Sequence, residues 1–207
     1  MTVRRERNAE KSRQDILRAA ERHFAEKGFY GARVDEIAAE AVINKRMIYE
    51  YFDSKEGLYK QVLFEVYKRL ETAERELIEH QLSGVALIRS LISMYFDFLR
   101  DNDTFVSILM WENLNHARYL NEMPDGDVER PTIRFFMNEI RRGKEAGIFR
   151  PELDEEQVVI SLITVCFANF SNRHTLSKLF DMPLDSPEMM EKRKRHTIDL
   201  ILTYICR

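Results

Sequence analysis

The sequence predicts an all-α protein. Its first 123 residues contain no proline, and apolar residues along the chain recur at steps of three and four, the spacing of helices with a buried face. No segment sustains the alternation of apolar and polar residues that is typical of a half-buried β-strand. We therefore expect helices from one end of the chain to the other, each bounded by its capping residues.

Three helices are expected in the first part of the chain. Apolar residues spaced for one helix face predict a helix over roughly residues 9–27, and Gly28 follows it as a left-handed C-cap would. A two-turn helix is expected over residues 34–41 by the same spacing. Asn44 is a good N-cap for a further short helix directly behind it.

The fourth predicted helix is long. Asp53 and Ser54 can cap its start, and apolar residues from Leu58 onward then hold one face. From Lys55 to His80 it would measure roughly 39 Å, at the helical rise of about 1.5 Å per residue. No proline interrupts it, so such a rod could transmit movement between its ends.

Five further helices are expected behind this rod, bounded by proline, glycine and capping residues. They span residues 85–100, 104–119 and 128–146, and begin after Asp154 and after the pair Ser186-Pro187. Pro131 is expected in the first turn of the third of them, and Gly147 closes it.

The helix after Asp154 is apolar almost round its circumference over residues 158–167. Such a helix requires burial on more than one side, which a single chain of this size does not readily supply. We therefore interpret this helix and the last one, over roughly residues 155–205, as a surface for self-association.

Composition excludes several classes of protein. A net charge of -3 and an apolar content of 44% fit a globular chain rather than a disordered or collagen-like one. The longest apolar stretch, residues 158–170, is shorter than the roughly 20 residues of a membrane helix. The basic start is not followed by the apolar core of an export signal, so we expect a cytoplasmic location. Cys166 and Cys206 lack metal-ligand spacing, and no metal or cofactor is expected.

The segment NKRMIYEYF, residues 44–52, is the candidate for function. A short helix, a tight turn and a second short helix form the arrangement in which one helix enters the major groove of DNA and the other braces it. With Ile48 and Phe52 packed inward, basic and tyrosine side chains remain outside, where they can reach phosphates and base edges. A short basic arm precedes it, with Arg4, Arg5, Arg7, Lys11 and Arg13 against Glu6 and Glu10.

Residues 13–59 resemble the DNA-binding domain of the TetR (tetracycline repressor) family of bacterial regulators. The matching residues are Ile16-Leu17, Ala19-Ala20, Phe24, Gly28-Phe29, Val34, Ile37-Ala38, Ala41, Ile48-Tyr49, Phe52, Ser54-Lys55-Glu56 and Leu58. The resemblance implies a helix-turn-helix domain over residues 1–54 and a helical effector-binding and dimerisation domain over residues 55–207. It also implies a transcriptional regulator, most often a repressor, that binds a palindromic operator as a homodimer and responds to a small-molecule effector.

Transferred position by position, the resemblance implies contacts with double-stranded DNA. We predict these contacts at Arg33, Asn44, Lys45, Arg46, Met47, Tyr49, Tyr51 and Lys55. A DNA phosphate at the start of the long helix would explain Lys55 there, where the helix dipole favours an anion. Two departures from the family pattern stand out: Val42 replaces a common glycine in the turn, and Ala32-Arg33 replace a threonine pair.

The C-terminal part offers side chains for a small-molecule cavity. Large, adaptable residues gather between Met94 and Asn138, and ligand pockets are mostly apolar with a few orienting polar groups. Each of these residues taken alone is more often part of a core. We predict ligand contacts at Met94, Phe98, Trp111, Asn113, Phe135 and Asn169.

Two other classes of function were weighed. An enzyme is disfavoured because HExxH, GxSxG, P-loop and GxGxxG motifs are absent and Glu112 with His116 forms no paired Glu-x-x-His repeat, so no catalytic residue is assigned. A helical adaptor could bind protein through the basic run of residues 192–195, but a solvated outer helix face explains that run better. Binding to duplex DNA separates a regulator from an adaptor.

Overall fold

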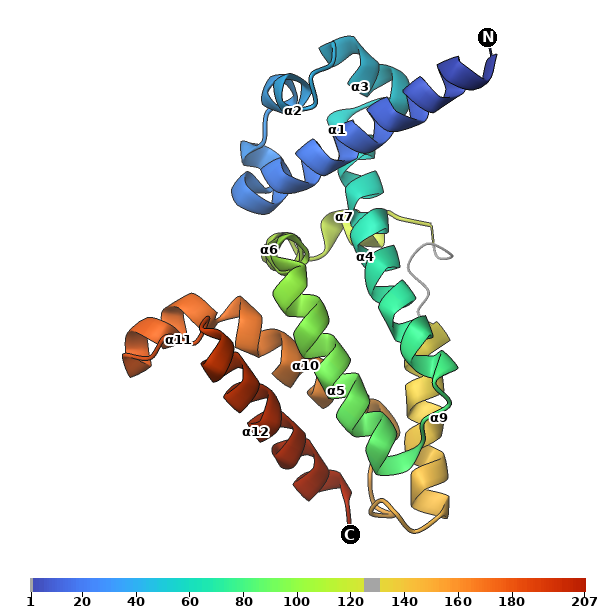
Figure 1. Cartoon of the computed structure of the whole chain (residues 1–207), viewed down its shortest axis with the longest axis vertical. Helices are drawn as coiled ribbons and strands as arrows, with labels where there is room; N and C mark the ends of the chain where they lie inside the picture. Colours follow the sequence, from blue (N-terminus) through green and yellow to red (C-terminus); the bar gives the residue numbers. More distant parts are fainter. Residues whose placement is uncertain (1, 125–130) are drawn as a thin grey trace. The chain divides into compact units, whose positions relative to one another are not determined.

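The computed structural model describes residues 2–124 and 131–207, with side chains from residue 9 onward. Within these residues the regular secondary structure consists of helices. One isolated antiparallel β-bridge joins Phe149 to Cys206. The predicted all-α fold is confirmed (Figure 1). In the described part of the chain, none of the helices has the combination of length and apolar character that a bilayer crossing requires.

The helices are labelled in Figure 1 in chain order. They are α1 (Thr2–Gly31), α2 (Val34–Glu40), α3 (Lys45–Phe52), α4 (Lys55–Glu79), α5 (Gly84–Asp101), α6 (Asp103–Leu114), α7 (Arg118–Asn121), α9 (Pro131–Glu145), α10 (Glu155–Ser171), α11 (Arg173–Phe180) and α12 (Pro187–Ile205). The chain forms two compact units. Unit 1 comprises Met1–Lys68 with Ser107–Val128, and unit 2 comprises Arg69–Val106 with Glu129–Arg207. The boundary expected between residues 54 and 55 stays a prediction.

The core of unit 1 follows the apolar spacing of α1 to α4. Ile16 and Phe24 of α1, Ile37 of α2 and Ile48 of α3 are completely buried. The ring of Phe24 meets that of Tyr59 on α4 edge to face, with 4.8 Å between centroids. α1, α2, α3 and the start of α4 therefore share one apolar core.

α1 bends at Gly28, whose φ of 66° lies in the region that side chains avoid. The ring of Trp111 lies against this bend, and its Nε1 donates to the carbonyl of Ala25 at 3.1 Å. A Cβ on Gly28 would come within 2.8 Å of the indole ring. Gly28 has the positive φ of a left-handed cap, but its ψ of 177° lies outside the left-handed helical region and the helix continues to Gly31, so the predicted end at Lys27 is wrong. α1 also begins at Thr2 rather than near residue 9.

The continuous helix predicted over residues 104–119 is wrong, because the chain breaks between α6 and α7 at His116 and Ala117, both with positive φ. The buried carboxylate of Glu112 accounts for the break. It accepts from the hydroxyl of Tyr59 at 2.9 Å and from the backbone N–H of Leu120 at 3.2 Å. The chain must turn after α6 to bring the N–H of Leu120 back to Glu112. The spacing of apolar residues in the sequence does not reveal this turn.

In unit 2, α5 packs against α9, α10 and α12, which lie side by side with it in Figure 1. Phe96 of α5 and Phe170 of α10 meet with 5.5 Å between ring centroids. Glu74 at the C-terminal part of α4 is completely buried and accepts from the hydroxyls of Tyr95 and Thr132. The core thus combines apolar packing with a buried polar cluster.

Capping residues set the ends of the C-terminal helices as predicted. Asp154 accepts from the N–H of Gln157 at 3.1 Å to start α10, and Ser186 accepts from that of Met189 at 3.3 Å to start α12. α9 begins at Pro131, and Gly147 follows its end with φ at 72°. The first residues of the helix expected over 128–146 lie outside the described residues. α11 was not predicted, since its N-cap makes no side-chain hydrogen bond and none of its residues is buried.

Candidate DNA-binding surface

α3 is placed by one polar cap and two apolar contacts. The Oδ1 of Asn44 accepts from the backbone N–H of Arg46 at 2.9 Å, which starts the helix. Ile48 and Phe52 are buried on its inner side. The predicted capped helix is therefore confirmed, and its inner face is buried against the rest of unit 1.

The outer side of α3 carries the side chains that the sequence assigned to DNA. Lys45, Arg46 and Tyr49 are exposed, and 84% of the Arg46 side chain is accessible. Met47 and Tyr51 are half-buried, so each presents part of its side chain. Arg33 is exposed at the N-terminus of α2 and Asn44 at that of α3. These residues lie on α3 or at the N-caps of α2 and α3, while their contacts with DNA stay a prediction.

The two cations of α3 are held by carboxylates at the surface. Lys45 Nζ lies 2.8 Å from Asp35 of α2, and this hydrogen bond raises the pKa of Lys45. Arg46 Nε lies 2.9 Å from Glu50 one turn along α3. Exposed ion pairs of this kind contribute only about 0–1 kcal/mol. A DNA phosphate can therefore replace either carboxylate at small cost.

Lys55 has an internal partner that the sequence did not reveal. Its ammonium lies 4.8 Å from the ring centroid of Phe29, a cation–π distance. The side chain is half-buried, and burial lowers its pKa. The ring of Phe29 thus accounts for a cation at the start of α4, so an external phosphate is not required to explain it.

An ionic brace joins α1 to α2. Lys27 Nζ donates to Glu36 at 2.6 Å, and Arg22 Nε donates to Glu40 at 2.6 Å. His23 Nε2 lies 2.8 Å from the same Glu40. These hydrogen bonds lower the pKa of Glu36, through Lys27, and of Glu40, chiefly through Arg22. The brace supports α2, which packs against α3. Its signal in the sequence is the helical spacing of the basic residues on α1 and of Glu36 and Glu40, four apart, on α2.

The predicted ligand residues are divided between the two units. Trp111 and Asn113 belong to unit 1, and Asn113 donates to the carbonyl of Leu109 on its own helix at 2.9 Å. Met94, Phe98, Phe135 and Asn169 belong to unit 2. Phe98 is buried against Phe105 and Phe135 stacks edge to face on Phe136, so both rings take part in packing. Ligand contacts at these six positions stay a prediction.

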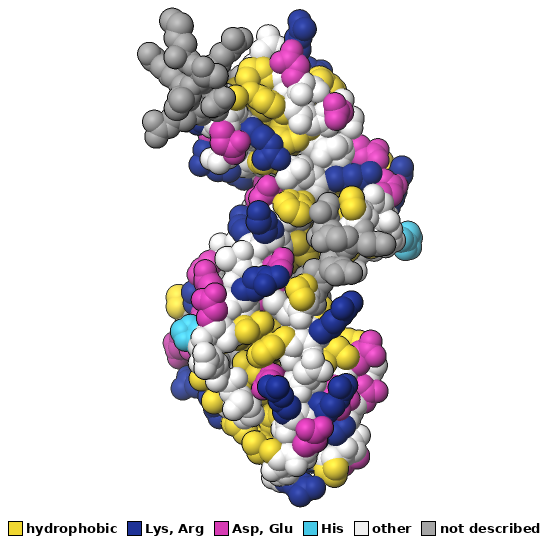
Figure 2. All heavy atoms as spheres, turned by 90° about the vertical axis from the view of Figure 1, so that its right-hand side faces the viewer, with side chains coloured by type: hydrophobic (Ala, Val, Ile, Leu, Met, Phe, Trp, Pro, Cys, Tyr) yellow, Lys and Arg dark blue, Asp and Glu magenta, His cyan; other side chains and the backbone are white. Residues whose placement is uncertain are grey.

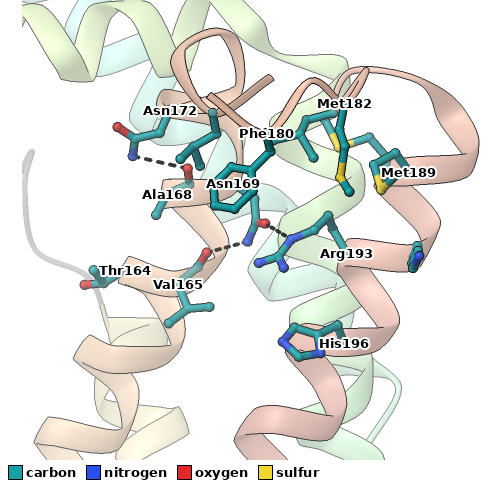
Figure 3. A pocket seen from close by; sticks show the side chains of 14 residues that line it. Thr164, Val165, Ala168, Asn169, Asn172, Phe180, Met182, Met189, Arg193 and His196 are labelled. Atoms are coloured by element: carbon teal, nitrogen blue, oxygen red, sulfur yellow. Dashed lines mark hydrogen bonds between the residues drawn. The ribbon is translucent and has the colours of Figure 1, made fainter. Parts of the chain in front are cut away.

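A cavity of about 670 Å³ lies between α10, α11 and α12 of unit 2 (Figure 3). Asn169 lines it, as does Arg193 from the basic run of residues 192–195. That run is not a uniformly solvated face: Lys192 and Arg195 are exposed, whereas Arg193 and Lys194 are half-buried. Sequence reasoning missed Arg193 because neighbouring basic residues on a helix point in different directions.

α10 and α12 also present apolar side chains outward. Ile160 of α10 and Leu200 and Tyr204 of α12 are about half exposed, at 49%, 50% and 58%.

Charges of both signs are mixed on the face of the molecule seen in Figure 2. Lys and Arg are interspersed there with Asp and Glu, so no broad field of one sign covers that face.

Comparison with known proteins assigns the chain to a family. Residues 16–62 match the model of bacterial regulatory proteins of the tetR family, and residues 85–201 match the tetracyclin repressor-like C-terminal domain. The chain is 32% identical over 183 residues to the HTH-type transcriptional repressor NicS of Pseudomonas putida, covering 87% of this chain and 85% of NicS. The chain belongs to the TetR family. It is accordingly a DNA-binding transcriptional regulator and not an enzyme.

Solved structures of this TetR fold match over nearly the whole chain. FadR of Bacillus subtilis, solved in complex with stearoyl-CoA, has a TM-score of 0.72 at 18% identity, covering 92% of this chain and 97% of that one. A ketosteroid transcriptional regulator of Mycobacterium tuberculosis has a TM-score of 0.71 at 21% identity, covering 94% of this chain and 95% of that one. Both comparisons bear on the fold.

Proposed function

We propose that this TetR-family protein is a repressor that binds a palindromic operator as a homodimer and is modulated by a small-molecule effector. Its DNA contacts are Arg33, Asn44, Lys45, Arg46, Met47, Tyr49, Tyr51 and Lys55. The observation that carries the proposal is the division of α3 into a buried face, with Ile48 and Phe52, and an exposed face with Lys45, Arg46 and Tyr49. A bacterial protein with this role acts in the cytoplasm, where the chromosome lies.

The repressor role is supported by the likeness to NicS, which is described as a transcriptional repressor. The homodimer is supported by the outward apolar side chains of α10 and α12, because a two-fold pair would cover the same patch on each copy. Two DNA-reading helices related by a two-fold axis call for two half-sites, hence a palindromic operator. A small molecule acts on such a regulator only to the extent that it prefers one of its conformations.

The test is binding of the full chain to a labelled duplex carrying the DNA upstream of its own gene, followed by fluorescence anisotropy. Replacing Arg46→Ala should weaken binding by about 1–3 kcal/mol if Arg46 reads a base, and relax the sequence preference at one position. If it contacts only a phosphate, binding should weaken for all sequences and depend less on salt.

The matched control is Arg75→Ala. Arg75 is also an exposed arginine paired with a glutamate four residues away, Glu71, but it lies on α4 in unit 2. Its removal should leave DNA affinity unchanged. Equal affinity for the wild type, Arg46→Ala and Arg75→Ala would contradict the assignment of α3 as the DNA-reading helix.

A further inference from the structure

The cavity of α10, α11 and α12 has the size and lining of a small-molecule site. Its volume of about 670 Å³ lies within the roughly 300–1,000 Å³ of typical ligand pockets. Most of its wall is apolar and adaptable, because three methionines, Met182, Met189 and Met190, line it together with Leu176 and Phe180. Figure 3 shows Phe180, Met182 and Met189 at one end of the space between α10 and α12.

The polar side chains of this cavity are cationic or neutral. Lys192, Arg193 and His196 line it with Asn169, and none of its fourteen lining residues is an aspartate or a glutamate. Arg193 reaches from α12 toward α10, where its Nε donates to the Oδ1 of Asn169 at 2.8 Å (Figure 3). Asn169 in turn donates to the carbonyl of Val165 at 2.7 Å. The second bond orients the amide, so that its oxygen faces Arg193 and holds the guanidinium in place.

The neighbouring Lys194 shows how the fold treats a half-buried cation elsewhere on α12. Its Nζ lies 3.1 Å from Asp97 and 2.6 Å from Glu191, so two carboxylates compensate its charge. Arg193 has a neutral amide partner at Nε, and its two Nη groups find no acceptor among the residues that the structure describes. A guanidinium presents two parallel N–H groups that match a carboxylate. The arrangement therefore leaves the anion-binding edge of Arg193 available within an apolar cavity.

We propose that this cavity binds a small amphipathic anion, with a carboxylate on the Nη groups of Arg193 and an apolar body against Phe180 and the three methionines. The inference rests on the proposed function, since this anion would be the effector. The site lies between α10, α11 and α12, and two of these helices, α10 and α12, carry the proposed dimer surface. Occupancy of the cavity is thereby linked to how two copies pair, and through the pairing to the placement of the two DNA-reading helices.

The experiment uses a matched pair of probes, decanoate and decan-1-ol, which share an alkyl chain and differ in the charge of the head group. Binding to the purified full chain is measured by isothermal titration calorimetry. Wild-type protein should bind decanoate saturably at a ratio of one per chain, and more tightly than the alcohol. Arg193→Gln should lower decanoate affinity at least about tenfold, the loss of one charge-assisted contact, and leave decan-1-ol affinity unchanged.

Two further variants separate charge from structure. Asn169→Asp keeps the side-chain volume but places a carboxylate on Arg193 and removes the donor to the Val165 carbonyl. It should also lower decanoate affinity and spare decan-1-ol. Arg195→Gln is the matched control, because Arg195 is an exposed arginine of the same helix that does not line the cavity. It should leave both affinities unchanged. Circular dichroism and sedimentation confirm that each variant keeps its fold and mass.

Three results would overturn the inference. Wild-type protein could show no saturable binding of decanoate at millimolar concentration. Arg193→Gln could weaken decanoate and decan-1-ol equally, which makes the cavity a purely apolar one. Arg193→Gln could instead dissociate the dimer without changing decanoate affinity, which means that a second copy covers the cavity. Operator binding by the wild type, measured in parallel without probe, tests the proposed function independently.

Discussion

α3 and α12 each bury one face within the chain, and they differ in what the other face offers. The free side of α3 carries Lys45, Arg46 and Tyr49. The free side of α12 carries Leu200 and Tyr204, half exposed. A polar, cationic face gains little from burial but much from phosphates, whereas an apolar face gains from being covered. The two faces differ as the proposed partners would require, with DNA on unit 1 and a second copy of the chain on unit 2.

The largest expected effect is on self-association. Leu200→Glu places a charge at the centre of the proposed dimer surface and should weaken the dimer by about 3 kcal/mol, roughly a hundredfold. Sedimentation at micromolar concentration should then show a monomer. Leu114→Glu is the control, because Leu114 is also exposed but lies in unit 1. If Leu200→Glu sediments with the mass of a wild-type dimer, the exposed apolar face of α12 is not the dimer surface.

The stability of the fold should be nearly as sensitive to a change at Gly28. Gly28→Ala combines a strained φ of 66° with a Cβ 2.8 Å from the Trp111 ring. We expect it to lower the free energy of unfolding by about 3 kcal/mol, measured by urea denaturation. Gly31→Ala should stay within about 1 kcal/mol of wild type, because a Cβ there meets only Lys27 Cβ at 3.1 Å. Equal midpoints for the two variants would contradict this account of the bend.

A smaller effect, of opposite sign, is expected in the turn before α3. Val42 is β-branched yet has φ at 54° and is 89% exposed. Such a conformation costs roughly 1–2 kcal/mol for a residue with a Cβ, and glycine gives back part of the gain as conformational entropy. Val42→Gly should therefore stabilise the chain by about 0.5–1 kcal/mol and raise the Tm by a few degrees. A lower Tm would show that Val42 makes contacts worth more than its strain.

Local signals predicted much of the fold. Asn44, Asp154 and Ser186 start helices where the sequence placed them, because an N-cap needs only its own side chain and the next turn. The break at His116 and Ala117 was missed, since it depends on Glu112 meeting donors from α4 and α7 across the unit. Long-range partners of this kind leave no periodic trace in a single sequence.

The candidate sites show the same limit. The exposed face of α3 was predictable because the inward positions of Ile48 and Phe52 decide which neighbours point outward. Of the cavity residues, Asn169 was among those predicted, but Arg193 was not, because its proposed role depends on Asn169 of another helix. The sequence placed ligand residues by composition, and composition does not tell which large side chains pack together and which line a space.

The smallest expected effect concerns pH and the brace between α1 and α2. The pKa values of Glu36 and Glu40 lie below the ordinary glutamate value of 4.5, chiefly through hydrogen bonds from Lys27 and Arg22. Because the folded-state pKa values are lowered, the brace stabilises the folded chain fully above the ordinary value of 4.5. This stabilisation is lost as the pH falls through the lowered folded-state values. Because these pairs are exposed, the contribution is modest and screened by salt.

The measurement is the Tm from about pH 6 down to pH 3 at low and high salt. The double variant Glu36→Gln, Glu40→Gln should lose less Tm on acidification than the wild type, and the difference should shrink at high salt. His23 Nε2 also faces Glu40, at 2.8 Å. His23→Gln is therefore made both in the wild type and in the double variant, so that the difference between the two reports the carboxylates alone. Since α2 carries α3, DNA affinity should fall with acid before dimer mass does. Dissociation of the dimer first would mean that α12, rather than α3, depends on ionic support.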